Sequence, residues 1–325
     1  MILITGGAGF IGSVLAKELN NKGLSDLIIV DKVSNDGSNN NLNSIQYSKY
    51  YILDEFLSLD LDVLFAKIEY VFHIGACSST TEKDMDFLME NNVNFSKRLF
   101  KLAAKYKVPF IYASSAATYG DGDLGYSDSH NEISKLKPLN FYGDSKQIFD
   151  LWALKQLNFP PNWFGFKFFN VFGPNEYHKD DMRSLVHKGF QQINASGKIK
   201  LFKSYRPEFA DGEQKRDFIY VVDVVSAMIN FMNVLNPKYN GIYNLGTGQA
   251  RTFLDLIKAV FKSLEISEDI EFIEMPEEIK GQYQYFTQAE MDKFKQVLPD
   301  FKFHSLEEAV NDYILKYLNQ SNPYY

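Results

Sequence analysis

A tyrosine and a lysine four residues apart are well spaced for proton transfer. Tyr142 and Lys146 lie in the segment NFYGDSK, which has the pattern of a helix start, so both side chains share one helix face. A tyrosine with an ordinary pKa of about 10 is a weak base at neutral pH, but a nearby ammonium group stabilises its phenolate. Lowering that pKa by about 3 units corresponds to about 4 kcal/mol. The same spacing is also typical of a solvated helix face, so its meaning depends on the rest of the chain.

Ser115 stands just after an apolar segment that ends at Ala113. A residue that follows a parallel strand reaches the edge of the sheet where ligands bind. There its hydroxyl would hydrogen-bond the hydroxyl or carbonyl group of a ligand. The alternative is a serine that only closes a turn, and the presence of Tyr142 favours the first interpretation.

A glycine turn at the start of the chain predicts a dinucleotide site. The apolar residues 1–4 lead into TGGAGFIG, in which Gly6 permits a tight turn, Gly9 lets the backbone approach a pyrophosphate, and Gly12 lets the next helix pack closely. The N-terminus of that helix would face the phosphates. A second apolar run ends in Asp31 about 20 residues later, where an acid binds the adenosine ribose.

The order of apolar and helical segments predicts the sheet that positions these residues. Helical patterns at 13–21, 84–106 and 141–157 alternate with short apolar runs, and strands that are apolar on both faces are typical of a parallel sheet covered on both sides. We therefore expect a doubly wound α/β (Rossmann) domain. Its expected strands are residues 27–30, 50–53, 70–74, 109–113, 163–169 and 242–245.

A second, smaller lobe is expected to close over the sheet edge. The dinucleotide-binding domain would comprise residues 1–170 and also 216–248, and residues 171–215 and 249–325 would form a C-terminal α/β lobe for substrate. Residues 174–214 are polar and rich in turn residues, and two amphipathic helices are expected around residues 270–273. Ligands would then bind between the two parts.

Composition narrows the class of protein. The net charge is −7 over 325 residues, which argues against a general nucleic-acid surface because phosphate binding needs a basic face. Cys77 is the single cysteine, so an intramolecular disulfide is excluded. No run of eighteen apolar residues predicts a membrane span, and the N-terminus lacks the pattern of a signal peptide. We expect a cytoplasmic protein, and no metal site is predicted.

Several motifs together identify a resemblance to a known family. The glycine turn, the Ser115 segment, Tyr142-x-x-x-Lys146 and residues 167–174 resemble the extended short-chain dehydrogenase/reductase superfamily, which acts on nucleotide sugars. Within it, longer strings resemble the ADP-L-glycero-D-manno-heptose 6-epimerase family nearly from end to end. These strings are HIGACSSTTE, ASSAATYG, PLNFYGDSK, FNVFGPNEYHK, KRDFIYVVDV, YNLGTG and KGQYQYFTQA.

The resemblance implies an isomerase that needs no net oxidation. Such enzymes interconvert ADP-D-glycero- and ADP-L-glycero-β-D-manno-heptose for the lipopolysaccharide core, using tightly held NADP. Transient hydride transfer makes a ketone at C6″, and the hydride returns to its other face. A base is needed for each epimer, and by resemblance these bases are Tyr142 and Lys179, with Lys146 and Ser115 beside Tyr142. Lys179 taken alone reads as an ordinary loop lysine.

The resemblance also assigns contacts to the two ligands. The expected cofactor contacts are Gly6, Gly9, Phe10, Ile11, Gly12, Asp31, Lys32, Ile74, Gly75, Ala76, Cys77, Ser78, Asn91, Lys146, Val171 and Lys179. The expected nucleotide-sugar contacts are Asn170, Asp181, Lys188, Phe202, Lys203, Ser204, Tyr205, Arg216 and Tyr283. Arg216 suits a pyrophosphate through paired hydrogen bonds, although a salt bridge with the adjacent Asp217 is the alternative.

Some questions stay open at this point. Asp144 stands where the family usually has an aromatic residue, and Lys167 stands where it usually has arginine. Asp31 favours the free ribose of NAD, whereas Lys32 suits the 2′-phosphate of NADP; the resemblance favours NADP, with NAD possible. A homo-oligomer is expected.

Three other functions share parts of the pattern. A UDP-hexose 4-epimerase has the same fold but does not call for Lys179. A nucleotide-sugar 4,6-dehydratase needs an acid pair just after the active-site serine, where this chain has Ala116 and Ala117. A non-catalytic cofactor-sensing protein would not need Ser115, Tyr142 and the two lysines.

Overall fold

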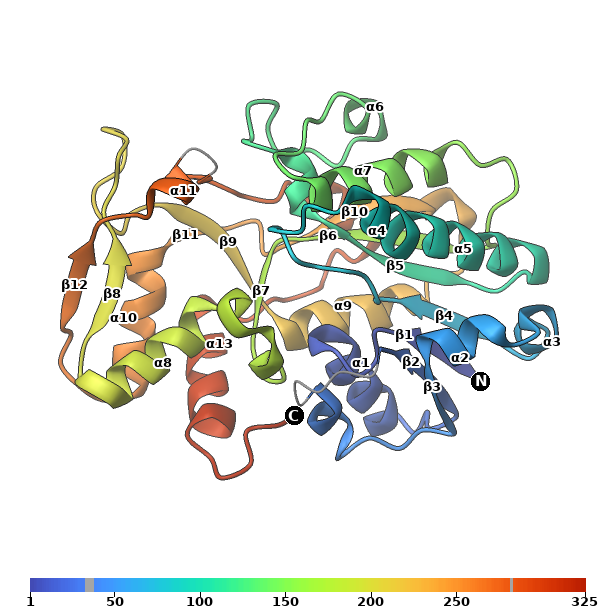
Figure 1. Cartoon of the computed structure of the whole chain (residues 1–325), viewed down its shortest axis with the longest axis horizontal. Coiled ribbons are helices and arrows are strands. Elements are labelled where there is room, and N and C mark those ends of the chain that lie inside the picture. Colours follow the sequence, from blue (N-terminus) through green and yellow to red (C-terminus); the bar gives the residue numbers. More distant parts are fainter. Residues whose placement is uncertain (33–37, 281–282) are drawn as a thin grey trace.

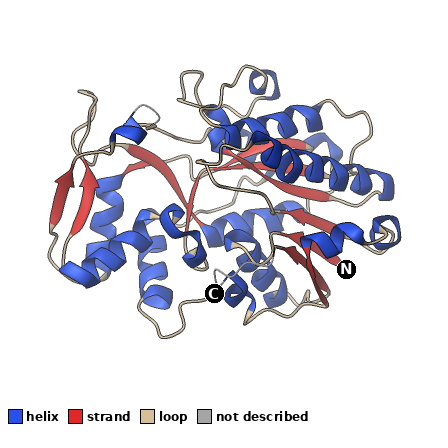
Figure 2. Ribbon diagram, in the orientation of Figure 1, coloured by secondary structure: helices blue, strands red, loops and turns tan. Residues whose placement is uncertain are grey.

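A seven-stranded parallel sheet forms the centre of the molecule (Figures 1 and 2). The structure is a computed structural model that describes residues 1–32, 38–280 and 283–325. From β1 the chain runs outward through β2 and β3, then crosses back to β4 on the other side of β1, in the order β10-β6-β5-β4-β1-β2-β3. The predicted doubly wound fold is confirmed. The strands are Ile2–Thr5 (β1), Leu27–Asp31 (β2), Lys49–Ile52 (β3), Tyr70–His73 (β4), Phe110–Ser115 (β5), Trp163–Phe168 (β6) and Gly241–Leu245 (β10).

Helices cover both faces of this sheet because its strands are apolar on both faces. In β1, Ile2 and Ile4 enter one hydrophobic core, and Leu3 between them enters the other. Helices α1 and α9 pack against the first core, and α5 and α7 against the second. The helices of this part are Phe10–Asn21 (α1), Leu53–Ser58 (α2), Leu61–Phe65 (α3), Met85–Leu88 (α4), Phe95–Tyr106 (α5), His130–Ile133 (α6), Phe141–Leu154 (α7) and Val221–Met232 (α9).

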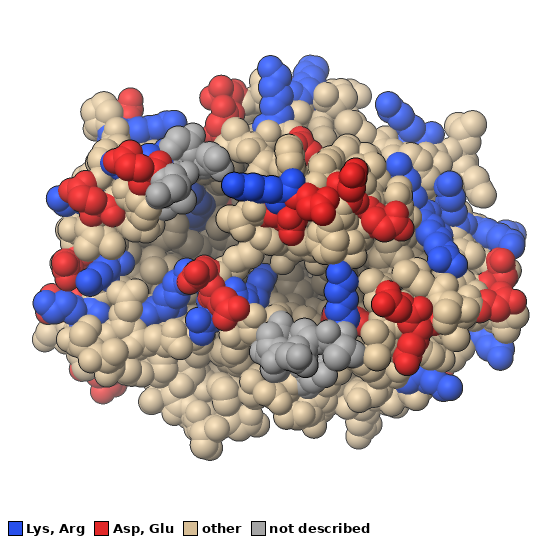
Figure 3. All heavy atoms as spheres, in the orientation of Figure 1, with Lys and Arg blue, Asp and Glu red and all other residues tan. Residues whose placement is uncertain are grey.

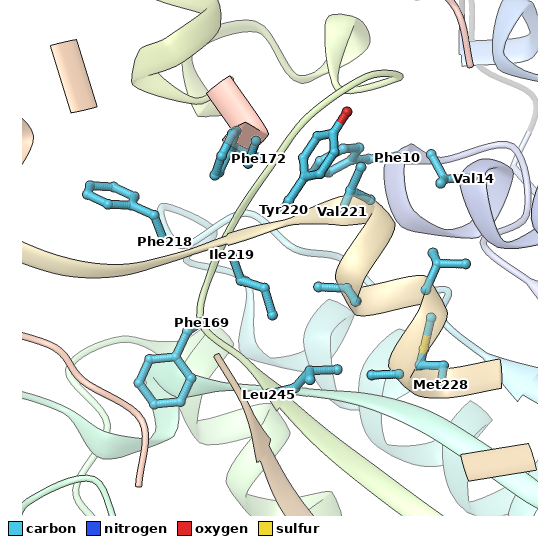
Figure 4. Packing of buried hydrophobic residues seen from close by; sticks show 14 of the residues in the cluster. Phe10, Val14, Phe169, Phe172, Phe218, Ile219, Tyr220, Val221, Met228 and Leu245 are labelled. Atoms are coloured by element: carbon cyan, nitrogen blue, oxygen red, sulfur yellow. The ribbon is translucent and has the colours of Figure 1, made fainter. Parts of the chain in front are cut away.

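The first core extends from the sheet toward the second part of the molecule. Figure 4 shows Phe10 and Val14 of α1 beside Val221 at the start of α9, with Phe172 on the adjoining chain. All four are almost fully buried. Burial of a side chain of this size contributes about 1.5–3 kcal/mol, so this packing fixes the position of α1 relative to the chain that leads away from the sheet.

Smaller sheets and further helices make up the second part (Figure 2). One sheet has the order β11-β9-β7, and a second consists of β12 paired in parallel with β8. The strands are Asn170–Phe172 (β7), Ile199–Phe202 (β8), Lys215–Tyr220 (β9), Ala250–Thr252 (β11) and Ile270–Ile273 (β12). The helices are Leu185–Ser196 (α8), Phe253–Ser263 (α10), Glu277–Lys280 (α11), Asp292–Val297 (α12) and Leu306–Tyr313 (α13). Figure 1 shows that the chain ends beside α1.

Short 3-10 and π segments join these elements. A π-helix continues α4 into α5, so the helix predicted over 84–106 is one nearly continuous run. The 3-10 segments are Ser38–Leu42 (η1), Ala116–Tyr119 (η3), Tyr177–Met182 (η4) and Pro237–Tyr239 (η5), and the π segments are Met89–Asn94 (η2) and Ile314–Leu318 (η6).

Two element predictions were wrong in detail. Leu53 does not end a strand but begins α2, where Asp54 and Glu55 in the first turn favour a helix. Helix α7 stops at Leu154, before 157. The segment 174–214, which is rich in turn residues, also contains α8 and β8, whose apolar residues enter the first core.

The division into two domains stays a prediction. β10 and β6 are paired in the central sheet although 72 residues separate Phe168 from Gly241 in the chain. In the ranges that the structure describes, no helix has the length and apolar character needed to cross a membrane.

Candidate active site

The glycine turn between β1 and α1 forms a cradle that larger side chains would fill. Gly6 adopts φ +68°. A Cβ on Gly12 would lie 2.1 Å from the Gly6 carbonyl oxygen, and a Cβ on Gly6 would lie 2.6 Å from the Cα of Gly75. Helix α1 begins at Phe10, and Gly9 before it gives no side-chain cap. A helix N-terminus of this kind favours an anion such as a pyrophosphate, so the residues present fit a dinucleotide.

An apolar pocket of about 210 Å³ adjoins the cradle. The Asp31 carboxylate accepts hydrogen bonds from the backbone N–H of Ala8 and of Lys32, both at 2.8 Å, and so braces the glycine turn. The Lys32 ammonium lies 4.7 Å from the centre of the Phe87 ring at the pocket wall. This shape fits an adenosine. The predicted cofactor residues that line the pocket are Gly6, Asp31, Lys32, Gly75, Ala76, Cys77 and Asn91.

A larger cavity, here called the main cavity, runs along the carboxyl edge of the sheet and has a volume of about 460 Å³. It brings together residues from the cradle, from the ends of β4, β5 and β6, and from α7 and η4. The predicted residues that line it are Gly6, Gly9, Phe10, Ile11, Gly12, Asp31, Ile74, Gly75, Ala76, Ser78, Ser115, Tyr142, Lys146, Asn170, Val171 and Lys179. In Figure 3 the face turned to the viewer is hollowed near its centre, and lysine or arginine side chains border the hollow.

Sequence reasoning assigned no ligand contact to some residues of the main cavity. Thr80, His178 and Met182 also line it. Thr80 and His178 stand inside strings that carry the family resemblance, so a signal for them was present. Met182 gave no signal, because its position depends on the path of the chain after Lys179.

Tyr142 and Lys146 occupy the first turns of α7, with exposed fractions of 9% and 7%. The Lys146 ammonium donates to the carbonyl of Ala113 at 2.9 Å and lies 5.9 Å from the centre of the Tyr142 ring. Burial raises the pKa of Tyr142, and a hydrogen bond with the Ser115 hydroxyl opposes that rise. Burial lowers the pKa of Lys146 to about 8, with Asp150 opposing. Lys146 therefore still carries its charge at neutral pH.

Asp150, which sequence reasoning missed, acts on the site through its charge near Tyr142 and Lys146. It lies on α7 and does not line the main cavity, but its carboxylate accepts from the hydroxyl of Ser114, which does, at 2.7 Å. The carboxylate also accepts from the Lys167 ammonium at 2.8 Å and the Tyr112 hydroxyl at 2.9 Å. Asp150 and Lys167 are both fully buried. The spacing of four residues from Lys146 placed Asp150 on the same helix face and was the available signal.

Asp144 lies in the first turn of α7, where the helix dipole favours a carboxylate. Burial raises the pKa of Asp144. Asp150, and not Asp144, is the carboxylate whose charge raises the pKa of Tyr142.

Lys179 reaches the main cavity from η4, on a different element from Tyr142. Its ammonium lies 5.4 Å from the centre of the Phe10 ring. Burial lowers the pKa of Lys179, and the charge of Glu176 opposes that shift. The site therefore holds two groups able to transfer protons, each with a different set of neighbours.

A second cavity, here called the lobe cavity, adjoins the main cavity and has a volume of about 530 Å³. The two share Asn170, Val171 and Met182. Its wall combines apolar side chains with cationic ones, which fits a nucleoside diphosphate. The apolar residues include Phe202, Phe218, Phe253, Ile273 and Tyr283, and the cationic ones are Arg183, Lys188 and Lys200. Arg183 and Lys200 were not predicted.

The other predicted substrate residues, Asp181, Lys203, Ser204, Tyr205 and Arg216, do not line the lobe cavity. The Arg216 guanidinium is buried, 5.3 Å from the centre of the Tyr283 ring, and donates to the backbone carbonyls of Lys215 and Gln284. Asp217 accepts instead from Thr247, Gly248 and Ala289, so the alternative of a salt bridge between these neighbours was wrong.

The segment after β8 turns partly toward other partners. Lys203 forms an ion pair with Glu274 at 2.7 Å, and the Tyr205 hydroxyl also bonds Glu274. The backbone N–H of Ser204 donates to Asp211. Asp181 is exposed, and its backbone carbonyl accepts from the ammonium of Lys188, a residue of the lobe cavity, at 2.5 Å.

Residues 2–246 match the NAD dependent epimerase/dehydratase family. The chain belongs to this family. Its name implies a nicotinamide cofactor, and the glycine cradle and apolar pocket fit one. The prediction that the chain binds a nicotinamide dinucleotide is confirmed, and the choice between NADP and NAD stays a prediction.

Among members of the epimerase/dehydratase family, this chain is 47% identical to an ADP-L-glycero-D-manno-heptose-6-epimerase of Nitratidesulfovibrio vulgaris, with all of both chains covered. It is also similar to the crystal structure of ADP-L-glycero-D-manno-heptose-6-epimerase from Helicobacter pylori, with TM-score 0.77, 28% identity, and 96% and 94% of the two chains covered. A UDP-N-acetylglucosamine 4-epimerase of Methanobrevibacter ruminantium has TM-score 0.80 at 23% identity over 96% of each chain, which shows the fold.

Proposed function

We propose that this protein is an ADP-L-glycero-D-manno-heptose 6-epimerase that inverts C6″ of the sugar through a 6″-ketone, for lipopolysaccharide core synthesis. Identity of 47% over the full length to an enzyme of that name supports the substrate. The observation that carries the chemistry is that Tyr142 and Lys179, from separate elements, line one cavity beside the glycine cradle. An epimerisation of this kind needs a proton-transfer group for each of two epimers.

The cofactor would be held by residues already described. Gly6, Gly9 and Gly12 form the pyrophosphate cradle, Asp31 and Lys32 line the adenosine pocket, and Lys146 lines the main cavity. When bound, the nicotinamide supplies a site that accepts a hydride and gives it back. The lobe cavity would take the nucleoside diphosphate of the substrate, with Lys188 and Arg183 near its phosphates.

Tyr142 would take the hydroxyl proton of one epimer. Its buried phenol resists ionisation, so the positive charge of Lys146 and the hydrogen bond of Ser115 are needed to stabilise the phenolate. Ser115 lines the same cavity as Tyr142 and would bond the same substrate oxygen. Lys179 would serve the other epimer, and its partly buried setting favours the neutral amine that a base requires.

Product analysis tests this proposal. The purified protein would be incubated with ADP-D-glycero-β-D-manno-heptose without added cofactor, and the products separated by chromatography. We expect the L-epimer to accumulate to an equilibrium mixture. UDP-glucose serves as the matched control. Conversion of UDP-glucose with no change in the ADP-heptose would contradict the proposal and favour a 4-epimerase.

We infer that the cofactor is NADP, because both oxygens of Asp31 accept backbone N–H bonds and Lys32 brings a positive charge to the same pocket. Replacing Lys32 by alanine is expected to raise the Kd of NADP about 10-fold and that of NAD less than about 2-fold, since a hydrogen bond to a charged group contributes about 1.5–3 kcal/mol. Both constants would be measured by calorimetry on protein stripped of cofactor.

The exposed Lys49 of the neighbouring strand β3 provides the control for loss of one positive charge. Lys49→Ala should leave both dissociation constants unchanged. If the wild-type protein binds NAD more tightly than NADP, or if Lys32→Ala weakens both equally, Lys32 does not select the cofactor.

A further inference from the structure

The segment Glu176–Ser184, here called the Lys179 loop, has a backbone that needs external support. It contains η4, and Asp180 next to Lys179 adopts φ +44° and ψ −120°, a left-handed conformation that non-glycine residues rarely adopt. Such a conformation costs about 1–3 kcal/mol and persists only where the surrounding structure enforces it. The Arg183 side chain and backbone N–H both donate to the Asp180 carbonyl, which helps to close the turn.

Glu176 joins the two ends of this loop. Its side chain is 1% exposed. One carboxylate oxygen accepts from the backbone N–H of Ser184 at 2.6 Å, and the other accepts from the Ser184 hydroxyl at 2.6 Å and the Gly173 N–H at 3.5 Å. The backbone carbonyl of Glu176 accepts from the N–H of Lys179 at 3.1 Å. One residue therefore fixes both the far end of the loop and the backbone of the lysine.

Burying a carboxylate costs folding free energy unless the carboxylate is hydrogen-bonded. A neutral side chain could close the same turn, so the charge of Glu176 calls for a second role. The negative charge of Glu176 also acts on the Lys179 ammonium. We propose that Glu176 is a positioning residue that holds Lys179 where it exchanges a proton with one epimer of the substrate. This inference rests on the proposed function.

Glu176→Gln tests the proposal. Glutamine offers one acceptor oxygen in place of two and directs an NH₂ donor at the donors of Ser184. We expect kcat to fall about 10²-fold with KM changed less than about 3-fold, because a displacement of about 1 Å at a catalytic group has an effect of that order. A rise in KM with kcat unchanged would contradict a positioning role.

Single-turnover measurements separate positioning from general damage. In the two-base account each epimer loses its hydroxyl proton to a different base, so a displaced Lys179 slows nicotinamide reduction by one epimer only. Glu176→Gln should slow the same epimer as Lys179→Met and leave the other within about 3-fold. Equal slowing of both epimers would overturn the proposal.

Asp223→Asn is the matched control. Asp223 is 3% exposed and accepts from His304 at 2.9 and 2.7 Å, so this variant also removes a buried, hydrogen-bonded carboxylate. Asp223→Asn should lower the melting temperature, but it should not slow nicotinamide reduction by one epimer more than by the other. If Glu176→Gln does not fold, Ser184→Ala provides a second test, because it keeps the Glu176 carboxylate and removes only the bond from the Ser184 hydroxyl. Ser184→Ala should slow the same epimer as Glu176→Gln, but by a smaller factor.

Hydrogen–deuterium exchange separates this inference from the proposed function. In Glu176→Gln the amides of Lys179 and Ser184 should exchange at least about 10-fold faster than in the wild-type protein, with or without substrate. Unchanged exchange would overturn the proposal even if the enzyme is an epimerase. Faster exchange in a protein that does not act on ADP-heptose would instead mean that the proposed function is wrong and the loop contact is real.

Discussion

Replacing Tyr142 by phenylalanine is expected to lower kcat about 10²–10⁴-fold, the usual range for a positioned acid or base. The variant loses only a hydroxyl, and the aromatic ring keeps its place on α7 among buried neighbours. Steady-state kinetics with ADP-D-glycero-β-D-manno-heptose would measure the effect, and the melting temperature should change by no more than a few degrees.

Tyr70→Phe is the matched control for this loss. Tyr70 is also buried, and its hydroxyl has no hydrogen-bond partner among the described residues. Removing it should leave kcat unchanged. Turnover of Tyr142→Phe close to that of the wild-type protein would remove Tyr142 from the mechanism.

Lys179→Met is expected to have an effect of the same order, about 10²–10⁴-fold on kcat. Methionine keeps most of the aliphatic length beside Phe10 but cannot accept or donate a proton. Binding of the cofactor should persist, because the cradle and the adenosine pocket are formed by other elements. The measurement is kcat together with the amount of NADP or NAD retained per chain.

Lys238→Met is the control for loss of a lysine. Lys238 lies in η5, is exposed, and packs over Tyr239. Its replacement should not change turnover. A Lys179→Met variant that epimerises at the wild-type rate would show that one base serves both epimers, and the two-base account would fail.

The parts of the site that depend on local spacing could be predicted from the sequence. Three glycines in one turn, and Tyr142 four residues before Lys146, specify their arrangement through one turn and one helix, whatever the rest of the chain does. The apolar strands were also recognisable, because burial on both faces leaves no polar alternation. The error at Leu53 arose where an apolar run continues from β3 into α2 without a break in hydrophobicity.

Contacts between distant segments could not be predicted in this way. The pairing of Asp150 with Lys167 depends on how α7 and β6 are brought together. The bonds that Ser184 donates to Glu176 lie within one loop and depend on its irregular backbone, which has no pattern in the sequence. Lys203 aligned with a substrate position, yet it pairs with Glu274, which is 71 residues away. Spacing along the chain carries no information about such a partner.

The fate of the hydrogen at C6″ tests the central claim most directly. ADP-D-glycero-β-D-manno-heptose carrying deuterium at C6″ would be converted in ordinary water without added cofactor, and the label in the L-epimer measured by mass spectrometry. If the protein inverts C6″ through a ketone and returns the same hydride, the product keeps its deuterium and no reduced nicotinamide accumulates. Loss of the label to water would mean direct proton abstraction, and steady build-up of reduced cofactor would mean a dehydrogenase; either result would contradict the account.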